Sequence, residues 1–183
     1  MPLLERLRFL CIASGNLDEF FEIRVSGLKQ LQELGSRQAA ADALSIEEQL
    51  TAIHERAARL VEEQYRCLNE HLLPGLAARG ILLLGHADWT AAAHQWLERY
   101  FEHEVEPVLS PLGLDPARPF PRIQNKSLNF IVRLEGRDAF GRDSKLAIVQ
   151  APRSLPRVVP VPSDGPQRTV VLLTGIVHAF VQK

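Results

Sequence analysis

The 183-residue sequence has few cysteines and no long uninterrupted apolar run. Its two cysteines, Cys11 and Cys67, lie far apart in segments that we predict to be helical, so we expect two buried, reduced thiols rather than a disulfide. Charged residues interrupt segment 1–12, which excludes the continuous apolar core of a signal peptide, and the segment is too short to cross a membrane. We therefore expect a cytoplasmic protein without a membrane span.

Common catalytic motifs are also missing. No Gly-rich run precedes Lys-Ser or Lys-Thr, so there is no P-loop, and neither a dinucleotide fingerprint nor a nucleophile elbow occurs. None of the six histidines has a second histidine at the four-residue spacing of a helical zinc site. His94 and Glu98 can meet across one helical turn, a pattern more typical of a surface pair. We predict no metal site and no catalytic residue in this chain.

Charge is divided unevenly along the chain. Through Asp115 there are 10 Lys and Arg against 18 Asp and Glu, a sum of −8, and after it there are 11 against 4, a sum of +7. A basic half can bind anionic ligands such as phosphates, because clustered positive charge raises their local concentration. Two surfaces that attract each other or other partners would give the same division.

The stretch 14–24 has the strongest local pattern. Leucines at helical spacing predict an amphipathic helix over 2–12, and Ser14-Gly15 would end it. Asn16 would then be the N-cap of a second helix from Leu17 to about Leu34, with Glu19 at the carboxylate position of a capping box. We interpret the Asn16 side chain as a cap, a role compatible with a ligand contact through its amide nitrogen.

Further helices are predicted up to residue 105. Segment 37–44 is either a loop or a weak helical turn. Ser45 and Glu48 form a second capping box before the longest predicted helix, and Pro74 either kinks that helix or opens a short one that ends at Gly80. The short apolar run 81–84 indicates a buried strand or extended core segment, and Asp88-Trp89-Thr90 introduces a helix to about Val105.

The pattern changes after residue 105. Five prolines lie between Glu106 and Pro121, and short β-favouring runs follow, separated by Gly, Asp, Pro and Ser. They predict a meander of three or four strands over 127–134, 146–150, 157–161 and 169–173, with the beginning of a helix at 174–183. We therefore predict an α+β fold: a helical domain of antiparallel helices over 1–105, then a partial, mainly antiparallel β domain over 106–183 that is truncated at its C-terminal end.

Nine basic residues in and before the β part could follow an anionic polymer or could be solvated surface charges. They are Arg118, Arg122, Lys126, Arg133, Arg137, Arg142, Lys145, Arg153 and Arg157. Their spacing does not place them on one face, since successive residues of a strand point to opposite sides. No interleaved aromatic platform accompanies them, which argues against a nucleic-acid partner bound by base stacking.

Two sets of motifs resemble the bacterial polyphosphate kinase family. Segment 2–10, Asn16-Leu17-Asp18-Glu19-Phe20-Phe21 and Arg24-Val25 resemble its N-terminal domain. A second, independent set resembles the start of its middle, or head, domain, in the same order as in the family. That set comprises Pro107-Val108-Leu109-Ser110-Pro111-Leu112, Pro119-Phe120-Pro121, Asn125-Lys126-Ser127-Leu128-Asn129 and Leu155-Pro156-Arg157.

The resemblance implies a function. The family transfers the terminal phosphoryl group of ATP to inorganic polyphosphate through a phosphohistidine, with Mg²⁺, and the full-length enzymes are homo-oligomers whose head domain contributes to dimer contacts and to the tunnel region. Asn16 matches the family asparagine that contacts ATP from the N-terminal domain. The nucleophilic histidine lies in C-terminal domains that have no counterpart here, so the resemblance assigns no histidine of this chain to that role.

Three departures from the family pattern limit the expected activity. The first helix of the family, with its Ser-Trp-Leu-Ser-Phe-Asn-like run, has no match here. Leu173-Thr174-Gly175 stands where the family tends to have Leu-Glu-Asp before a helix. The catalytic domains are missing. We expect a polyphosphate kinase fragment that is inactive alone and contributes ATP and polyphosphate contacts. The alternative is a non-catalytic binding or assembly module with the same fold.

Overall fold

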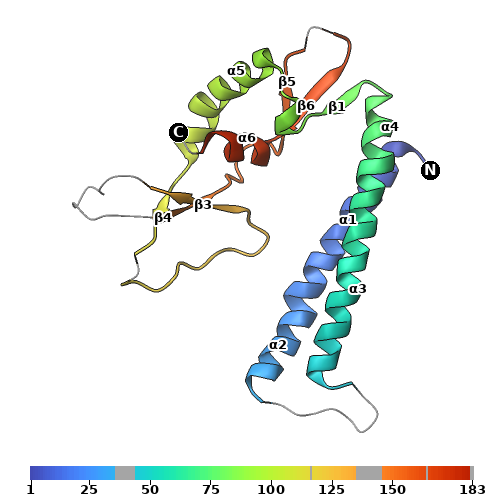
Figure 1. Cartoon of the computed structure of the whole chain (residues 1–183), viewed down its shortest axis with the longest axis vertical. Coiled ribbons are helices and arrows are strands. Elements are labelled where there is room, and N and C mark those ends of the chain that lie inside the picture. The colour runs from blue at the N-terminus through green and yellow to red at the C-terminus, as the bar shows by residue number, and fades with distance from the viewer. Residues whose placement is uncertain (36–43, 116, 135–145, 164, 182–183) are drawn as a thin grey trace. The chain divides into compact units, whose positions relative to one another are not determined.

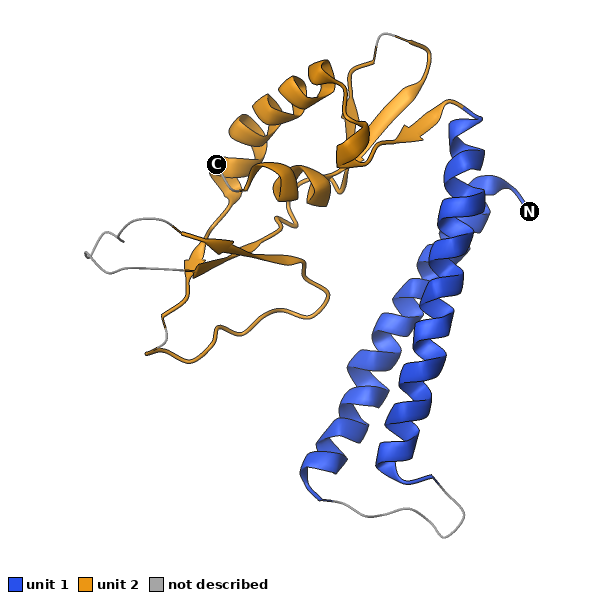
Figure 2. Ribbon diagram, viewed as in Figure 1, with its two compact units in different colours: residues 1–79 blue, residues 80–183 orange. Residues whose placement is uncertain are grey.

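The computed structural model describes residues 1–35, 44–115, 117–134, 146–163 and 165–181. The chain forms two compact units, residues 1–79 and 80–183 (Figure 2). Unit 1 is helical, and unit 2 combines helices with two small sheets, which confirms the predicted α+β class. The predicted Ala-rich segment 37–44 lies almost wholly outside the described residues.

The first helix of unit 1 is continuous through the stretch where we predicted a break. It comprises α1 (Leu3–Phe20), the π-helical turn η1 (Phe21–Val25) and α2 (Ser26–Glu33). The backbone is right-handed helical at both joins, with φ −66° and ψ −42° at Phe21 and φ −57° and ψ −45° at Ser26. The predicted stop at Ser14-Gly15 and the N-cap role of Asn16 are therefore wrong.

The physical reason is that Gly15 weakens a helix without stopping it. A glycine in a helix interior costs about 1 kcal/mol relative to alanine, whereas a proline would cost about 3 kcal/mol and would remove a hydrogen bond. No proline follows Pro2 in this helix, and the half-buried residues Leu10 and Leu17 lie on either side of Gly15. Packing of that apolar face outweighs the local preference for a break.

The second helix of unit 1 begins at the capping box that the sequence predicted. The backbone N–H of Glu48 donates to Ser45 Oγ at 3.2 Å, and the backbone N–H of Ser45 donates to Glu48 Oε2 at 2.8 Å. Helix α3 (Ile46–Cys67) continues through the π-helical turn η2 (Leu68–Leu72) into α4 (Leu73–Ala77), where Pro74 is in the first turn. Gly80, with φ +77°, follows in the left-handed region that favours glycine.

The two helices of unit 1 run side by side as an antiparallel hairpin (Figure 1). Helix α2 contacts α3, and α1 contacts both α3 and η2. They fit closely at Gly75, where an added Cβ would lie 3.1 Å from Leu3 Cδ1. Among the described residues of unit 1, the buried hydrophobic side chains are Val25, Leu72 and Leu76, so the hairpin has a thin core.

Unit 2 begins with a strand and a helix that the sequence assigned to the first domain. The strand is β1 (Ile81–Leu83). The 3₁₀ turn η3 (His86–Asp88) follows it and leads to helix α5 (Ala91–Tyr100). Helix α5 continues as the π-helical turn η4 (Phe101–Val105) and the 3₁₀ turn η5 (Glu106–Val108). Thr90 Oγ1 accepts from the N–H of Ala93 at 3.2 Å, as expected for an N-cap. The compact units therefore divide 26 residues before the expected boundary at 105/106.

The strands form two three-stranded sheets rather than one meander. The first has the order β1-β6-β5, with β5 (Val158–Val161) antiparallel and β1 parallel to β6 (Arg168–Leu172). The second has the order β2-β4-β3 and is antiparallel throughout; its strands are β2 (Leu112–Gly113), β3 (Asn129–Arg133) and β4 (Leu146–Gln150). The strand positions were predicted well, but β1 pairs with a strand more than 80 residues away, and no short-range pattern specifies such a partner.

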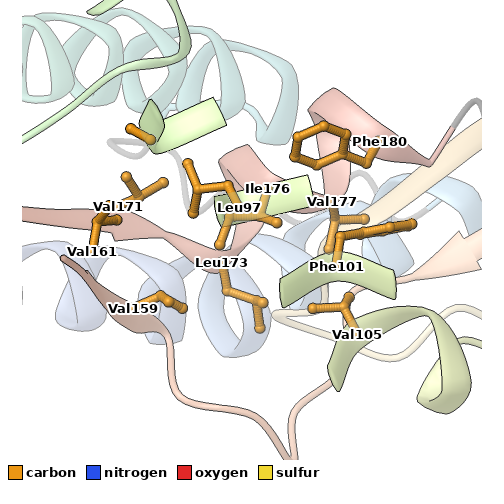
Figure 3. Packing of buried hydrophobic residues seen from close by; sticks show 11 residues of the cluster. Leu97, Phe101, Val105, Val159, Val161, Val171, Leu173, Ile176, Val177 and Phe180 are labelled. Carbon is orange, nitrogen blue, oxygen red and sulfur yellow. The ribbon is translucent and has the colours of Figure 1, made fainter. Parts of the chain in front are cut away.

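The core of unit 2 explains why α5 belongs there (Figure 3). Helix α6 (Leu173–Phe180) confirms the predicted C-terminal helix and contributes Ile176 and Phe180 to the cluster. Leu97 of α5 packs in the same cluster, together with Val159 of β5 and Val171 of β6. The inner face of α5 is therefore buried against elements that follow residue 150.

Two other predictions concern the burial of the cysteines and the absence of a membrane-spanning helix. Both cysteines are free, but Cys11 is exposed and Cys67 is half-buried, so the prediction of two buried thiols was wrong. Within the described ranges, no helix combines the length and the hydropathy that a membrane crossing requires.

Candidate functional site

Asn16 is the one site residue that the sequence singled out, and it lies on the exposed side of α1. Because it is in the helix interior, the backbone N–H groups of residues 18 and 19 belong to the helix's own hydrogen-bond ladder rather than to a cap. An N-cap role therefore does not explain the asparagine at this position. An exposed carboxamide offers one acceptor oxygen and a nitrogen with two donors, which suits the edge of a nucleobase or a ribose hydroxyl.

Apolar side chains surround Asn16 on the same face of the helix. Ile12 and Phe20 are one turn before and one turn after it, and Phe9 and Ile23 extend the row at both ends. All four apolar residues are exposed. We call these five residues the α1 stripe. The predicted break at Ser14-Gly15 separated the two halves of the stripe, so it was not predicted. The spacing 9, 12, 16, 20, 23 follows one face only when the helix is continuous.

A groove between the two helices of unit 1 is a second concave feature. It has a volume of about 190 Å³ and is mostly apolar, with lining residues Leu7, Leu10, Cys11, Ser14, Gln64, Tyr65 and Leu68. Gln64 Nε2 is buried there and has no hydrogen-bond partner within the described part of the chain. The groove is on the inner side of α1 and does not include Asn16.

The described histidines of unit 2 contact aromatic rings or backbone. His86 and His94 contact the Trp89 ring edge-on, at centroid distances of 4.8 Å and 6.1 Å, and His94 also contacts Phe180 at 5.1 Å. His103 Nδ1 lies 2.8 Å from the carbonyl oxygen of Arg99. These contacts give the histidines of unit 2 roles in packing and helix structure.

Two of the described basic residues of unit 2 contact neighbouring parts of the unit. Arg118 makes an exposed ion pair with Asp115 at 3.8 Å, and Arg153 Nη2 donates to the carbonyl oxygen of Asn125 at 3.0 Å. Arg133 is exposed on β3. The predicted basic residues Arg137, Arg142 and Lys145 lie outside the described residues.

Among the described residues, Glu48 and Tyr100 have shifted pKa values, and both shifts have structural causes away from Asn16. Hydrogen bonds from the hydroxyl and the backbone N–H of Ser45 lower the pKa of Glu48 below its usual value. Burial, followed by the nearby Glu104 carboxylate, raises the pKa of Tyr100. Neither residue is in the α1 stripe, so the stripe has no perturbed acid or base of the kind that general acid–base catalysis uses.

The described residues do not fit the Mg²⁺ that the resemblance implies. No three or more His, Cys, Asp or Glu side chains converge on a metal-binding position within those ranges. Mg²⁺ is usually held by carboxylates together with substrate phosphates. We therefore assign no metal ligand among the described residues and derive no step through the ion.

Comparison with known proteins places both units in one family. The family model described as "Polyphosphate kinase N-terminal domain" matches residues 1–84, and the one described as "Polyphosphate kinase middle domain" matches residues 92–183. The Xylella fastidiosa (strain 9a5c) polyphosphate kinase is 52% identical over 185 residues, and the Pseudomonas aeruginosa enzyme is 51% identical over 180 residues. These alignments cover 99% and 97% of this chain but 26% of each relative.

A solved structure gives the same assignment. The crystal structure of polyphosphate kinase from Porphyromonas gingivalis matches with a TM-score of 0.78 and 27% identity, over 99% of this chain and 26% of that chain. The chain thus spans about a quarter of the length of the relatives it matches. The two matched regions follow the same order as the two sets of motifs in the sequence. The chain belongs to the polyphosphate kinase family.

Proposed function

We propose that this chain supplies the N-terminal part of a polyphosphate kinase and that Asn16 contacts ATP. The observation that carries the proposal is the pair of family matches, which together cover nearly the whole chain in a single order. The exposed amide of Asn16, freed from a capping role, is available to a ligand. Its acceptor and donors suit the polar edge of a nucleotide.

Phosphoryl transfer itself belongs to segments outside these 183 residues. In the proposed reaction a histidine nitrogen takes the terminal phosphoryl group, ADP leaves, and the group then passes to the terminal oxygen of polyphosphate. The described histidines of unit 2 contact aromatic rings or backbone, and none pairs with a base in a way that would activate a nucleophile. We therefore expect the isolated chain to make no polyphosphate from ATP and Mg²⁺.

Polyphosphate and a second subunit are the further partners that we propose. The residues after Asp115 carry a formal charge of +7, which favours an anionic polymer. The β2-β4-β3 sheet has Leu112 and Ile131 on either side of Ile148, and both outer residues are exposed. These two exposed apolar residues suit a contact between subunits in the full-length enzyme.

The test of the ATP contact uses a full-length protein. This chain would replace the matching 180 residues of the Pseudomonas aeruginosa polyphosphate kinase, and the Kd for ATP would be measured by calorimetry. Asn16→Asp removes the amide donors and adds a negative charge, so we expect binding about tenfold weaker, equivalent to about 1.4 kcal/mol. Gln30→Glu makes the same charge change at an exposed position of α2 and should leave the Kd unchanged. An unaltered Kd in Asn16→Asp would remove Asn16 from the site.

The same chimera separates the enzyme fragment from the alternative, a non-catalytic module. A fragment should restore ATP-dependent polyphosphate synthesis when it is joined to the missing three quarters of the relative. A module that has lost the function would give a folded but inactive chimera. Synthesis by the 183-residue chain alone would contradict the assignment of the chemistry to other segments.

A further inference from the structure

The groove between the two helices of unit 1 has an apolar wall and a side-chain amide whose nitrogen has no partner among the described residues. Leu7, Leu10 and Leu68 form the apolar wall, and the amide belongs to Gln64. Its Nε2 atom is buried in the present orientation. Because no described group holds this nitrogen, the terminal amide can turn about χ3 and donate to a ligand in the groove without losing a hydrogen bond. The groove therefore offers one donor in apolar surroundings.

The chemistry of the lining favours a neutral ligand. Among the described residues that line the groove, none is Lys, Arg, Asp or Glu, and the polar ones besides Gln64 are Cys11, Ser14 and Tyr65. An anion such as ATP or polyphosphate would lose its hydration there without gaining an opposite charge. The groove is therefore unsuited to the phosphates of the proposed function, and its occupant belongs to another chemical class.

The volume of the groove limits the ligand to about one ring. An apolar cavity of about 150 Å³ can hold benzene. At about 190 Å³ the groove is slightly larger, which leaves room for a short substituent on the ring. A carbonyl group is the substituent that matches the lining, because its oxygen accepts a hydrogen bond and carries no charge.

We propose that this groove binds a small neutral molecule with one ring and one carbonyl group. The ring would pack between Leu7, Leu10 and Leu68, and the carbonyl oxygen would accept from Gln64 Nε2. Lining residues come from both helices, so a bound ligand joins the two halves of a hairpin that has a thin core. A ligand that binds only the folded hairpin stabilises it by mass action. Asn16 takes no part in this site, so the inference does not depend on the ATP contact.

Titration with acetophenone tests the site in the 183-residue chain. Acetophenone has one ring and one carbonyl group, and NMR of isotope-labelled leucine methyl groups reports where it binds. We expect the methyl signals of Leu7, Leu10 and Leu68 to shift together, with a Kd of about 1 mM, because so small a ligand makes few contacts. Shifts spread evenly over the leucines of both units, or no shift at all, would overturn the proposal.

The hydrogen bond is tested by a pair of ligands and a pair of proteins. The molecule α-methylstyrene has the shape of acetophenone with a CH₂ group in place of the carbonyl oxygen. Gln64→Leu removes the donor at similar size, so the ratio of the Kd of α-methylstyrene to that of acetophenone should be about fivefold lower than in the wild type. The ratio cancels the different hydrophobicity of the two ligands, and circular dichroism checks that the variant is folded. An unchanged ratio would remove the carbonyl group from the proposal.

Filling the groove is the second, independent test. Ser14→Leu places a larger side chain in the space of the ring, so we expect acetophenone to bind about tenfold more weakly. Ala13→Leu adds the same side chain at the neighbouring exposed position of α1, which does not line the groove, and should leave the Kd unchanged. Equal Kd values in these two variants would show that acetophenone binds elsewhere and would overturn the proposal.

Discussion

The two units of this chain bury very different amounts of apolar surface. Unit 2 collects 11 buried hydrophobic residues from α5, η4, two strands and α6 into one cluster. The described part of unit 1 buries three, although its two helices are longer than any in unit 2. Helix length therefore does not measure how well a unit is stabilised.

The difference in buried apolar surface indicates which unit is less stable by itself. A two-helix hairpin has only one interface, so each helix leaves most of its circumference in water. Unit 2 packs helices on a sheet and encloses side chains such as Leu97 and Ile176 completely. We expect unit 2 to be the more stable of the two units, because it buries more apolar side chains.

The largest predicted effect is on the core of unit 2. Leu97 is fully buried, so Leu97→Ala removes its contacts and leaves a cavity. We expect the free energy of unfolding of unit 2 to fall by about 3 kcal/mol. Both tryptophans, Trp89 and Trp96, lie in this unit, so tryptophan fluorescence in a urea titration measures it. Leu112→Ala, at a half-exposed position in the same unit, should change it by less than about 1 kcal/mol.

The second prediction compares the units directly. Circular dichroism at 222 nm reports mainly the long helices of unit 1, whereas tryptophan fluorescence reports unit 2. We expect the helical signal to be lost first, with a midpoint lower by about 1 M urea, because the hairpin has the smaller core. Coincident transitions would show that the two units unfold together and would remove the distinction between them.

Local signals in the sequence predicted local structure well. Ser45 and Glu48 form the expected capping box, Thr90 caps α5, and β4 has the predicted bounds 146–150. Each of these features depends on residues close together in the chain. The family resemblance likewise rested on short motifs, and the comparisons confirm it.

Features that depend on tertiary packing were not predictable in the same way. Ser14-Gly15 has the composition of a helix end, but the helix continues there because its apolar face packs on α3 and η2. The pairing of β1 with β6 and the place of α5 in unit 2 depend on contacts with distant residues. Asn16 was found by resemblance, while the apolar residues around it became visible only in the continuous helix.

A smaller effect is expected at the start of α3. Ser45→Ala removes the side-chain acceptor of the Glu48 N–H and the hydroxyl that bonds the Glu48 carboxylate. We expect the hairpin to lose about 1 kcal/mol, measured by circular dichroism in urea, with no change in tryptophan fluorescence. Ser45→Thr keeps a hydroxyl and should restore most of the stability. An equal effect on both signals would argue that the units are coupled.

The smallest effect is a pH dependence that the hairpin should show and unit 2 should not. The pKa of Glu48 is lowered in the folded chain from an ordinary value of 4.5, so the folded state favours the ionised carboxylate. This contribution to stability is fully present above pH 4.5 and is lost as the pH falls through the lower, folded-state pKa. Other carboxylates titrate in the same range, so the informative quantity is the difference between the wild type and Glu48→Gln. We expect the difference in the midpoint of the helical signal to shrink as the pH falls from 4.5 through the lower, folded-state pKa of Glu48, because both side chains are uncharged once Glu48 is protonated. A difference that is independent of pH would mean that the hydrogen bonds of the capping box, and not its charge, stabilise the start of α3.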